Sequence, residues 1–229
     1  KLNTFSTCTM TTEPASPVQL SPWPTAQRRI GLTGGIASGK SSVSHYLAEK
    51  YGLPVLDADA YAREALAPGS AATKAVLDRY GSAVTEASPH TPASIDRSTL
   101  GRIVFSDALE RRWLESLVHP IVRQRFETEL VNLQNKAVVV MVIPLLFEAE
   151  LESLCNEIWV VHCSASQQLQ RLMHRDQLSK PAAEARLAAQ WPLETKTALA
   201  DTVIDNTGAA EKWVDQVSHQ IERLLIDAR

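Results

Sequence analysis

The sequence predicts an α/β protein with a parallel five-stranded sheet that carries helices on both faces. Short apolar runs alternate with helical patterns along much of the chain, and strands separated by helices form parallel sheets. One run, residues 136–143, is continuous and β-branched, which is typical of a strand buried on both faces. Strands are expected at residues 29–33, 54–56, 136–143, 157–163 and 202–205.

The sequence predicts one helix directly after a glycine-rich turn and two longer helical stretches further along the chain. Residues 40–50 place Val43 and Leu47 at helical spacing directly after a glycine-rich turn. Residues 71–134 are mostly helical without a convincing strand, which predicts an inserted helical subdomain. Residues 167–194 are rich in Arg and Gln and predict two helices joined by a turn.

The start of the chain has a different composition. Residues 1–27 are rich in Ser, Thr and Pro and lack apolar periodicity, so we expect a disordered leader. This segment has no apolar core of a secretory signal, which favours a cytoplasmic protein.

Bulk composition excludes several classes of function. The 229 residues are 45% apolar and carry a net charge of −3, which predicts a sizeable core and neither nucleic-acid nor membrane binding. No apolar run approaches the roughly 18 residues of a membrane-spanning helix. The three cysteines, without C-x-x-C spacing, argue against a disulfide scaffold and a zinc site.

The strongest motif is GGIASGKS at residues 34–41, which matches the phosphate-binding P-loop pattern G-x-x-x-x-G-K-[ST]. Glycines let backbone N–H groups wrap closely around an anion, and the following helix adds the positive end of its dipole. Lys40 is expected to reach the β- and γ-phosphates of ATP, and the Ser41 hydroxyl to ligate Mg²⁺. The motif follows an expected strand and opens an expected helix, as a P-loop does.

Other nucleotide-binding classes fit less well. Residues 135–138 (NKAV) have Val where the base-recognition motif of a signalling GTPase requires Asp, and the L-S-G-G-Q segment of transport ATPases does not occur. A small-molecule kinase is the class that remains.

Two carboxylates, Asp57 and Asp59, follow the second expected strand. Ligands of open α/β sheets bind beyond the carboxyl ends of the strands, so a carboxylate there can orient an acceptor hydroxyl and take its proton. The alternative is a helix N-cap, because Asp is common at strand-to-helix turns. Beside a P-loop, the functional interpretation is favoured.

Together with these motifs, many further positions resemble the dephospho-CoA kinase family, and the resemblance covers residues 29–225. The matching positions are 30–36, 56–59, 62–63, 95–97, 100, 103–105, 119–120, 144–148, 169, 171, 175–176, 186, 190 and 203–208.

The resemblance implies a reaction and a domain arrangement. The reaction is transfer of the γ-phosphate of ATP to the ribose 3′-hydroxyl of dephospho-CoA, the last step of coenzyme A synthesis. A P-loop kinase core is expected at residues 28–66, 135–166 and 195–229, with a helical substrate domain at 67–134 and a lid at 167–194. The expected partner is the small-molecule substrate, and the protein is expected to be a monomer or small homo-oligomer.

The resemblance and the motifs together assign site residues. The expected catalytic residues are Asp59 as base, Lys40 and the lid arginine Arg171. The expected residues for ATP are Gly34, Gly35, Ala37, Ser38, Gly39, Lys40, Ser41, Ser42, Arg175, Asn206 and Gly208, with Ser41 also holding the metal. The expected substrate-binding residues are Asp57, Arg63, His119, Glu148 and Arg186.

Several assignments keep an alternative. Arg171 and Arg175 are four residues apart on one helix face, which also suits a solvated charged surface. His119 precedes Pro120, so a helix break with a packed histidine competes with a substrate contact. Glu148 is otherwise an ordinary loop carboxylate. For the whole chain, the alternatives are another small-molecule or nucleotide kinase and a non-catalytic nucleotide-binding regulator.

The sequence departs from the family at two P-loop positions. The family usually has Gly where Ala37 stands, and often Thr where Ser42 stands. Ala37 matters only if its backbone needs a positive φ, which alanine tolerates poorly.

Overall fold

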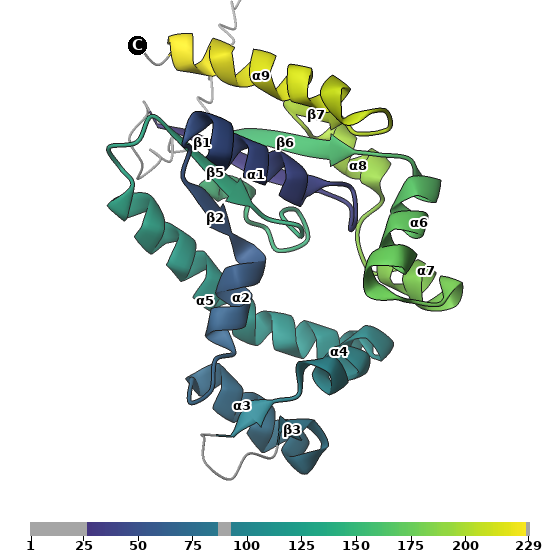
Figure 1. Cartoon of the computed structure of the whole chain (residues 1–229). Coiled ribbons are helices and arrows are strands. Elements are labelled where there is room, and N and C mark those ends of the chain that lie inside the picture. Colours follow the sequence, from purple (N-terminus) through teal and green to yellow (C-terminus); the bar gives the residue numbers. More distant parts are fainter. Residues whose placement is uncertain (1–26, 87–92, 228–229) are drawn as a thin grey trace, which may run out of the picture.

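The computed structural model describes residues 27–86 and 93–227 (Figure 1). The expected disordered leader, apart from Gln27, lies outside the described residues. None of the helices in the described ranges is long and apolar enough to cross a membrane.

A five-stranded parallel sheet forms the centre, as predicted. Its order is β2-β5-β1-β6-β7, so β1 lies in the middle and pairs with β5 on one side and β6 on the other. The strands are β1 (Arg28–Gly34), β2 (Val55–Asp57), β5 (Val138–Val142), β6 (Glu157–His162) and β7 (Thr202–Asp205).

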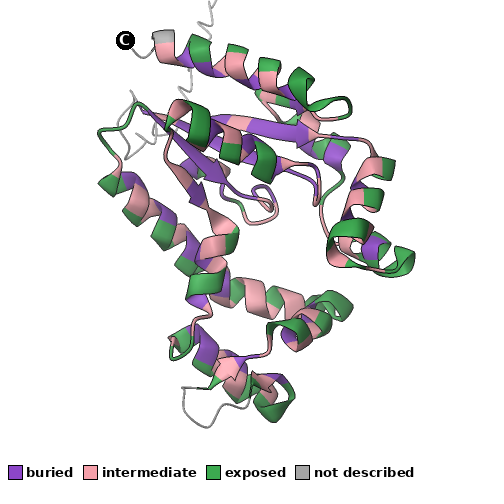
Figure 2. Cartoon of the chain, viewed as in Figure 1, coloured by how far each residue is buried: buried purple, intermediate pink, exposed green. Residues whose placement is uncertain are grey.

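Helices cover both faces because the side chains of β5 alternate between two apolar clusters. Val138, Val140 and Val142 pack with α1 (Lys40–Tyr51) and α9 (Ala210–Asp227). Val139 and Met141 face the other way and pack with Val118, Val122, Phe126 and Leu130 of α5 (Ala108–Asn132). Figure 2 shows the central strands β1, β5 and β6 mostly buried and the covering helices buried along one side only, which is the pattern of a two-faced core.

The predicted helical insertion has a core of its own. It follows α2 (Ala58–Ala65), whose Tyr61 and Ala65 pack in the sheet-side cluster, and it contains α3 (Ala71–Tyr80), the 3₁₀ turn η1 (Gly81–Val84), α4 (Arg97–Ser106) and α5. Val76, Val84, Ile95, Leu100 and Val104 form a separate buried cluster there.

The insertion also holds two strands, so the expectation of none was wrong. β3 (Thr85–Glu86) and β4 (Ser94–Ile95) pair antiparallel, Thr85 opposite Ile95. Two residues are too few for a period-2 pattern, so this ribbon left no signal in the sequence.

The helix break considered at Pro120 is also wrong. Helix α5 continues through Pro120, whose ring is exposed to solvent. Proline costs the helix one backbone hydrogen bond. Burial of Val118 and Val122 on either side holds the helix against the sheet and outweighs that loss.

The predicted pair of helices at residues 167–194 is α6 (Ala165–Asp176) and α7 (Lys180–Ala188), with Pro181 in the first turn of α7. Figure 1 shows this pair beyond the carboxyl end of β6. A further short helix, α8 (Leu193–Ala198), returns to the sheet, and the 3₁₀ turn η2 (Glu152–Leu154) precedes β6.

A buried ion pair joins α8 to the segment that follows β5. The Lys196 ammonium lies 2.7 Å from Glu148 Oε1 and donates to the Pro144 carbonyl oxygen at 3.1 Å. Lys196 is 0% exposed. A fully buried cation is stable only when it is paired in this way, so the contact fixes where α8 meets the core.

The backbone of the β1–α1 loop is unusual at three positions. Gly34 and Gly39 have φ values of 143° and 106°, and Ala37 has a φ of 58°. A Cβ on Gly34 would lie 2.5 Å from the Val161 carbonyl oxygen, so that glycine is required by space as well as by φ. Ala37 therefore occupies a conformation that favours glycine.

Replacing Ala37→Gly should leave the protein as stable or raise its free energy of unfolding by up to about 1 kcal/mol, because the left-handed backbone is strained for alanine. Urea denaturation measures the change. The control is Ala48→Gly within α1, which should destabilise by about 1 kcal/mol. Equal losses of unfolding free energy for Ala37→Gly and Ala48→Gly would contradict backbone strain at Ala37.

Replacing Lys196→Met should lower the free energy of unfolding by about 3–5 kcal/mol, because the partly buried Glu148 carboxylate then loses its cation. Adding Glu148→Leu should recover part of this loss. The control is Lys180→Met, which breaks the exposed Lys180–Glu184 pair and should cost under about 1 kcal/mol. If urea denaturation gave a loss for Lys196→Met no larger than for the control, the ion pair would not be stabilising the fold.

Candidate active site

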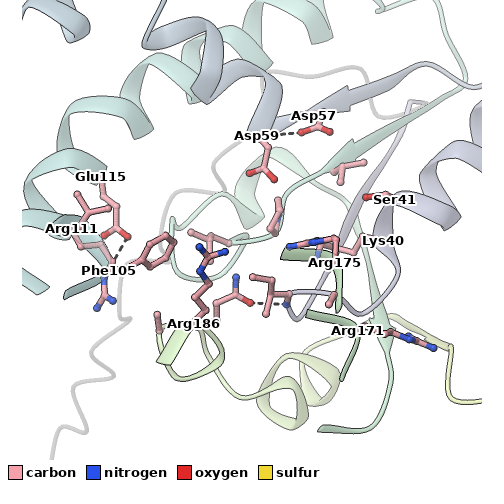
Figure 3. A pocket seen from close by; sticks show the side chains of 18 of the residues that line it. Lys40, Ser41, Asp57, Asp59, Phe105, Arg111, Glu115, Arg171, Arg175 and Arg186 are labelled. Atoms are coloured by element: carbon pink, nitrogen blue, oxygen red, sulfur yellow. Dashed lines mark hydrogen bonds and ion pairs between the residues drawn. The ribbon is translucent and has the colours of Figure 1, made fainter. Parts of the chain in front are cut away.

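A cleft of about 630 Å³ lies where the P-loop, the start of α2, the helical insertion and the α6–α7 pair meet. Its lining includes Lys40 and Ser41 from α1, Asp57 and Asp59 from the β2–α2 junction, and residues of α4, α5, α6 and α7. Figure 3 shows these side chains converging from separate elements. The carboxyl ends of β1, β2 and β5 bring the elements together.

Lys40 is buried and folds back over its own loop. Its ammonium donates to the carbonyl oxygens of Gly34 at 3.1 Å and Gly35 at 2.8 Å. Burial, followed by the nearby Lys196 charge, lowers the pKa of Lys40 to about 8, although Asp59 opposes the shift. The group is therefore a poorly solvated cation that an arriving phosphate would stabilise.

The backbone around Lys40 supplies further donors. Helix α1 starts after Gly39, and no side chain among the described residues caps its first N–H groups. Uncapped N–H groups at a helix start form an anion site. The Ser38 N–H donates within the loop to Gly35, and the exposed Ser42 follows Ser41 on α1.

The two aspartates have different positions. Asp57 caps α2, because its Oδ1 accepts from the N–H groups of Asp59 at 2.7 Å and Ala60 at 3.1 Å. The N-cap considered from the sequence is therefore present at Asp57, which also lines the cleft. The Asp59 carboxylate points into the space that Lys40 and Ser41 border from the other side (Figure 3).

The surroundings of Asp59 suit a proton acceptor. Desolvation in the cleft, and then repulsion from Asp57, raise the pKa of Asp59, while Lys40, Arg63 and Arg175 pull it down. Arg63 lies one turn further along α2 and is exposed. It acts on Asp59 through its charge and is not part of the described lining of the cleft.

Arg175 and Arg186 are tied to one carboxylate on the α6–α7 pair. Asp176 accepts from Arg175 Nε at 2.7 Å and from Arg186 Nη1 at 2.7 Å. The hydrogen bond from Arg175 lowers the pKa of Asp176. The Arg186 guanidinium also lies 5.2 Å from the centre of the Phe105 ring, across the cleft on α4.

Arg171 and Arg175 both line the cleft, but their guanidinium groups point apart (Figure 3). Arg171 Nη2 donates to the Asn206 carbonyl oxygen at 3.2 Å. Their spacing of four residues therefore places Arg171 and Arg175 on one helix face, but it does not determine which way their side chains point.

Asn206 lies against the back of the P-loop. Its Nδ2 donates to the Ser38 carbonyl oxygen at 2.8 Å, and a Cβ on Gly39 would lie 2.2 Å from that nitrogen. Gly208 is exposed beside Lys212. Neither residue is in the described lining of the cleft, so the expected contacts of both with ATP stay predictions.

His119 and Glu148 are also absent from the described lining. His119 is half-buried on α5, and burial lowers its pKa. Glu148 Oε1 accepts from the Trp191 N–H at 2.9 Å and pairs with Lys196. Their expected substrate contacts stay predictions.

The cleft contains residues that the sequence did not single out for the site. Arg111, Leu114 and Glu115 come from one face of α5, and Gln190 follows α7. Phe105 is 51% exposed although it is a large apolar residue. The spacing of Arg111 and Glu115 on a helix was visible, but only the packing of α5 turns that face toward the P-loop.

Known proteins of one enzyme family resemble this chain over most of its length. The family model described as "Dephospho-CoA kinase" matches residues 28–212. The dephospho-CoA kinase of Prochlorococcus marinus (strain MIT 9313) is 61% identical over 196 residues, 86% of this chain and 96% of that protein. That of Synechococcus sp. (strain CC9605) is 61% identical over 193 residues, 84% of this chain and 91% of that protein.

Solved structures agree with the sequence comparison. TT1252 from Thermus thermophilus is 34% identical with a TM-score of 0.72, covering 87% of this chain and 99% of that one. The dephospho-CoA kinase from Campylobacter jejuni is 28% identical with a TM-score of 0.62, covering 86% and 96%. On this agreement in sequence and fold, the chain belongs to the dephospho-CoA kinase family.

Proposed function

We propose that this protein transfers the γ-phosphate of ATP to the ribose 3′-hydroxyl of dephospho-CoA and releases coenzyme A and ADP. The observation that carries the proposal is the Asp59 carboxylate, which faces a buried lysine and a helix start across one cleft. Membership of the dephospho-CoA kinase family supports the choice of acceptor.

The residues fit ATP and Mg²⁺. Lys40, the uncapped start of α1 and the arginines of α6 and α7 offer the positive charge that a triphosphate needs. The described residues contain no cluster of three or more His, Cys, Asp or Glu side chains for a metal. The Ser41 hydroxyl would therefore hold Mg²⁺ together with phosphate and water oxygens, the ligand set this ion accepts. When bound, the ion would offset the negative charge of the phosphate groups.

The chain's own groups then divide the work. Asp59 orients the 3′-hydroxyl and takes the proton that this group loses as its oxygen bonds to phosphorus. Its raised pKa makes it a better base than an ordinary aspartate. Lys40, Arg171, Arg175 and Arg186 stabilise negative charge on the transferred group. In this scheme Asp57 acts through the N-cap that positions Asp59.

The competing functions differ in the acceptor molecule that would be phosphorylated. Another P-loop small-molecule kinase would phosphorylate a different acceptor, and a nucleotide-binding regulator would phosphorylate none. An ADP-release assay with dephospho-CoA, adenosine, nucleoside monophosphates and sugar acids separates them, and we expect turnover with dephospho-CoA above all others. A cytoplasmic location and a monomeric or small homo-oligomeric state stay predictions.

Replacing Asp59→Asn should lower kcat by roughly 10²–10⁴-fold while ATP binding changes little, because the amide cannot accept the proton. Steady-state kinetics and calorimetric ATP titration measure the two quantities. Asp78→Asn, on the exposed side of α3, is the matched control and should behave as wild type. Wild-type turnover of Asp59→Asn would remove this residue as the base.

The pH dependence of kcat/KM for ATP should report Lys40 in the free enzyme. Only charged Lys40 attracts phosphate, and its pKa is lowered to about 8, so kcat/KM should fall as the pH rises through this value. In Lys40→Arg the guanidinium stays charged, so the fall near pH 8 should vanish even if activity is lower throughout. The same fall in Lys40→Arg would show that another group causes it.

A further inference from the structure

Both backbone polar groups of one P-loop residue, Ile36, are held by glutamine side chains from a distant part of the chain. The Ile36 N–H donates to Gln190 Oε1 at 2.9 Å. The Ile36 carbonyl oxygen accepts from Gln168 Nε2 at 2.9 Å. Gln168 lies on α6, and Gln190 lies just after α7 ends.

These two contacts fix two successive peptide planes. The Ile36 N–H belongs to the peptide shared with Gly35, and the Ile36 carbonyl belongs to the peptide shared with Ala37. Ala37 is the residue with the strained φ of 58°. Backbone groups at such a turn need partners, and here side chains supply them.

The packing around Gln168 is equally close. A Cβ on Gly35 would lie 2.0 Å from Gln168 Nε2, so this position accepts only glycine while the glutamine is in place. Gln168 is 7% exposed. The glutamine pair is thus part of the loop's support and is not a surface contact.

The segment that carries Gln190 is itself anchored to the core. The next residue, Trp191, donates its N–H to Glu148 Oε1 at 2.9 Å, and its ring stacks on Phe147 with a 6.0 Å separation of ring centres. Glu148 is paired with buried Lys196. Gln190 therefore lies between the α6–α7 pair, which is the expected lid, and Trp191, which is held by Glu148 and Phe147. From this point the Gln190 side chain reaches the P-loop.

We propose that Gln190 is a positioning residue that holds the P-loop in its phosphate-binding shape and couples this shape to the end of the α6–α7 pair. Gln190 acts through the Ile36 peptide. Without it the free loop samples other conformations, and ATP must restore the binding shape at a cost in affinity. Once ATP is bound at saturation the loop is ordered, so the chemical step is preserved. The inference rests on the proposed function only in that ATP is the ligand of the loop.

The test uses the full chain with Gln190→Met, which keeps side-chain length and removes the acceptor. The expected result is a three- to ten-fold rise in the calorimetric Kd for ATP and a similar rise in KM for ATP, roughly the effect of one lost hydrogen bond. The kcat should stay within about two-fold, and KM for dephospho-CoA should not change. Hydrogen exchange of the Ile36 amide should become faster while that of β1 stays slow.

Two variants make the outcome decisive. Gln170→Met changes the same residue type on the exposed side of α6 and should leave all these quantities at wild-type values. Gln190→Glu keeps an oxygen acceptor, so Ile36 exchange should remain slow in it. An unchanged Kd for ATP in Gln190→Met, an equal rise in Gln170→Met, or a loss of kcat without a change in Kd would overturn the proposal. Because ATP binding is read directly, a failure of phosphoryl transfer to dephospho-CoA would count against the proposed function alone.

Discussion

The ammonium group of Lys40 is buried against the carbonyl oxygens of Gly34 and Gly35, within the loop whose sequence motif predicts phosphate binding. Two carbonyl dipoles are weak partners for a full charge, and burial lowers the pKa of the lysine accordingly. Without a bound ligand, the charged Lys40 ammonium is therefore poorly stabilised, and a bound anion would stabilise it. Contacts from distant parts of the chain hold this lysine and its loop in place.

The support of the loop comes from parts that are distant in the sequence. Asn206, after β7, holds the Ser38 carbonyl from behind, and Gln168 and Gln190 hold Ile36 from the side of α6 and α7. The buried Lys196–Glu148 pair anchors the segment next to Gln190. Asn206 and Glu148, which were both expected to bind ligands, therefore also have structural partners in this chain.

The proposed base, Asp59, lies on the wall of the cleft that faces Lys40 and Ser41. One carboxylate, Asp57, serves as the cap of α2, which leaves Asp59 to face the cleft. On the α6–α7 pair, a further carboxylate, Asp176, accepts hydrogen bonds from both Arg175 and Arg186. Asp57 and Asp59 thus differ in role although they are close in sequence. Backbone N–H groups of α2 engage the Asp57 carboxylate, whereas the Asp59 carboxylate faces the cleft.

The sequence by itself determined the five-stranded parallel sheet, the P-loop and the carboxylate at the end of β2, because apolar periodicity and a fixed-spacing motif are local signals. It missed the β3–β4 ribbon and considered a break at Pro120, since two-residue pairing and the packing of α5 against the sheet depend on distant residues. Tertiary structure alone decided that Arg171 and Arg175 point apart, that α5 faces the cleft, and that Gln190 reaches Ile36. Each of these depends on side-chain direction and on contacts between separate elements, which spacing along the chain does not specify.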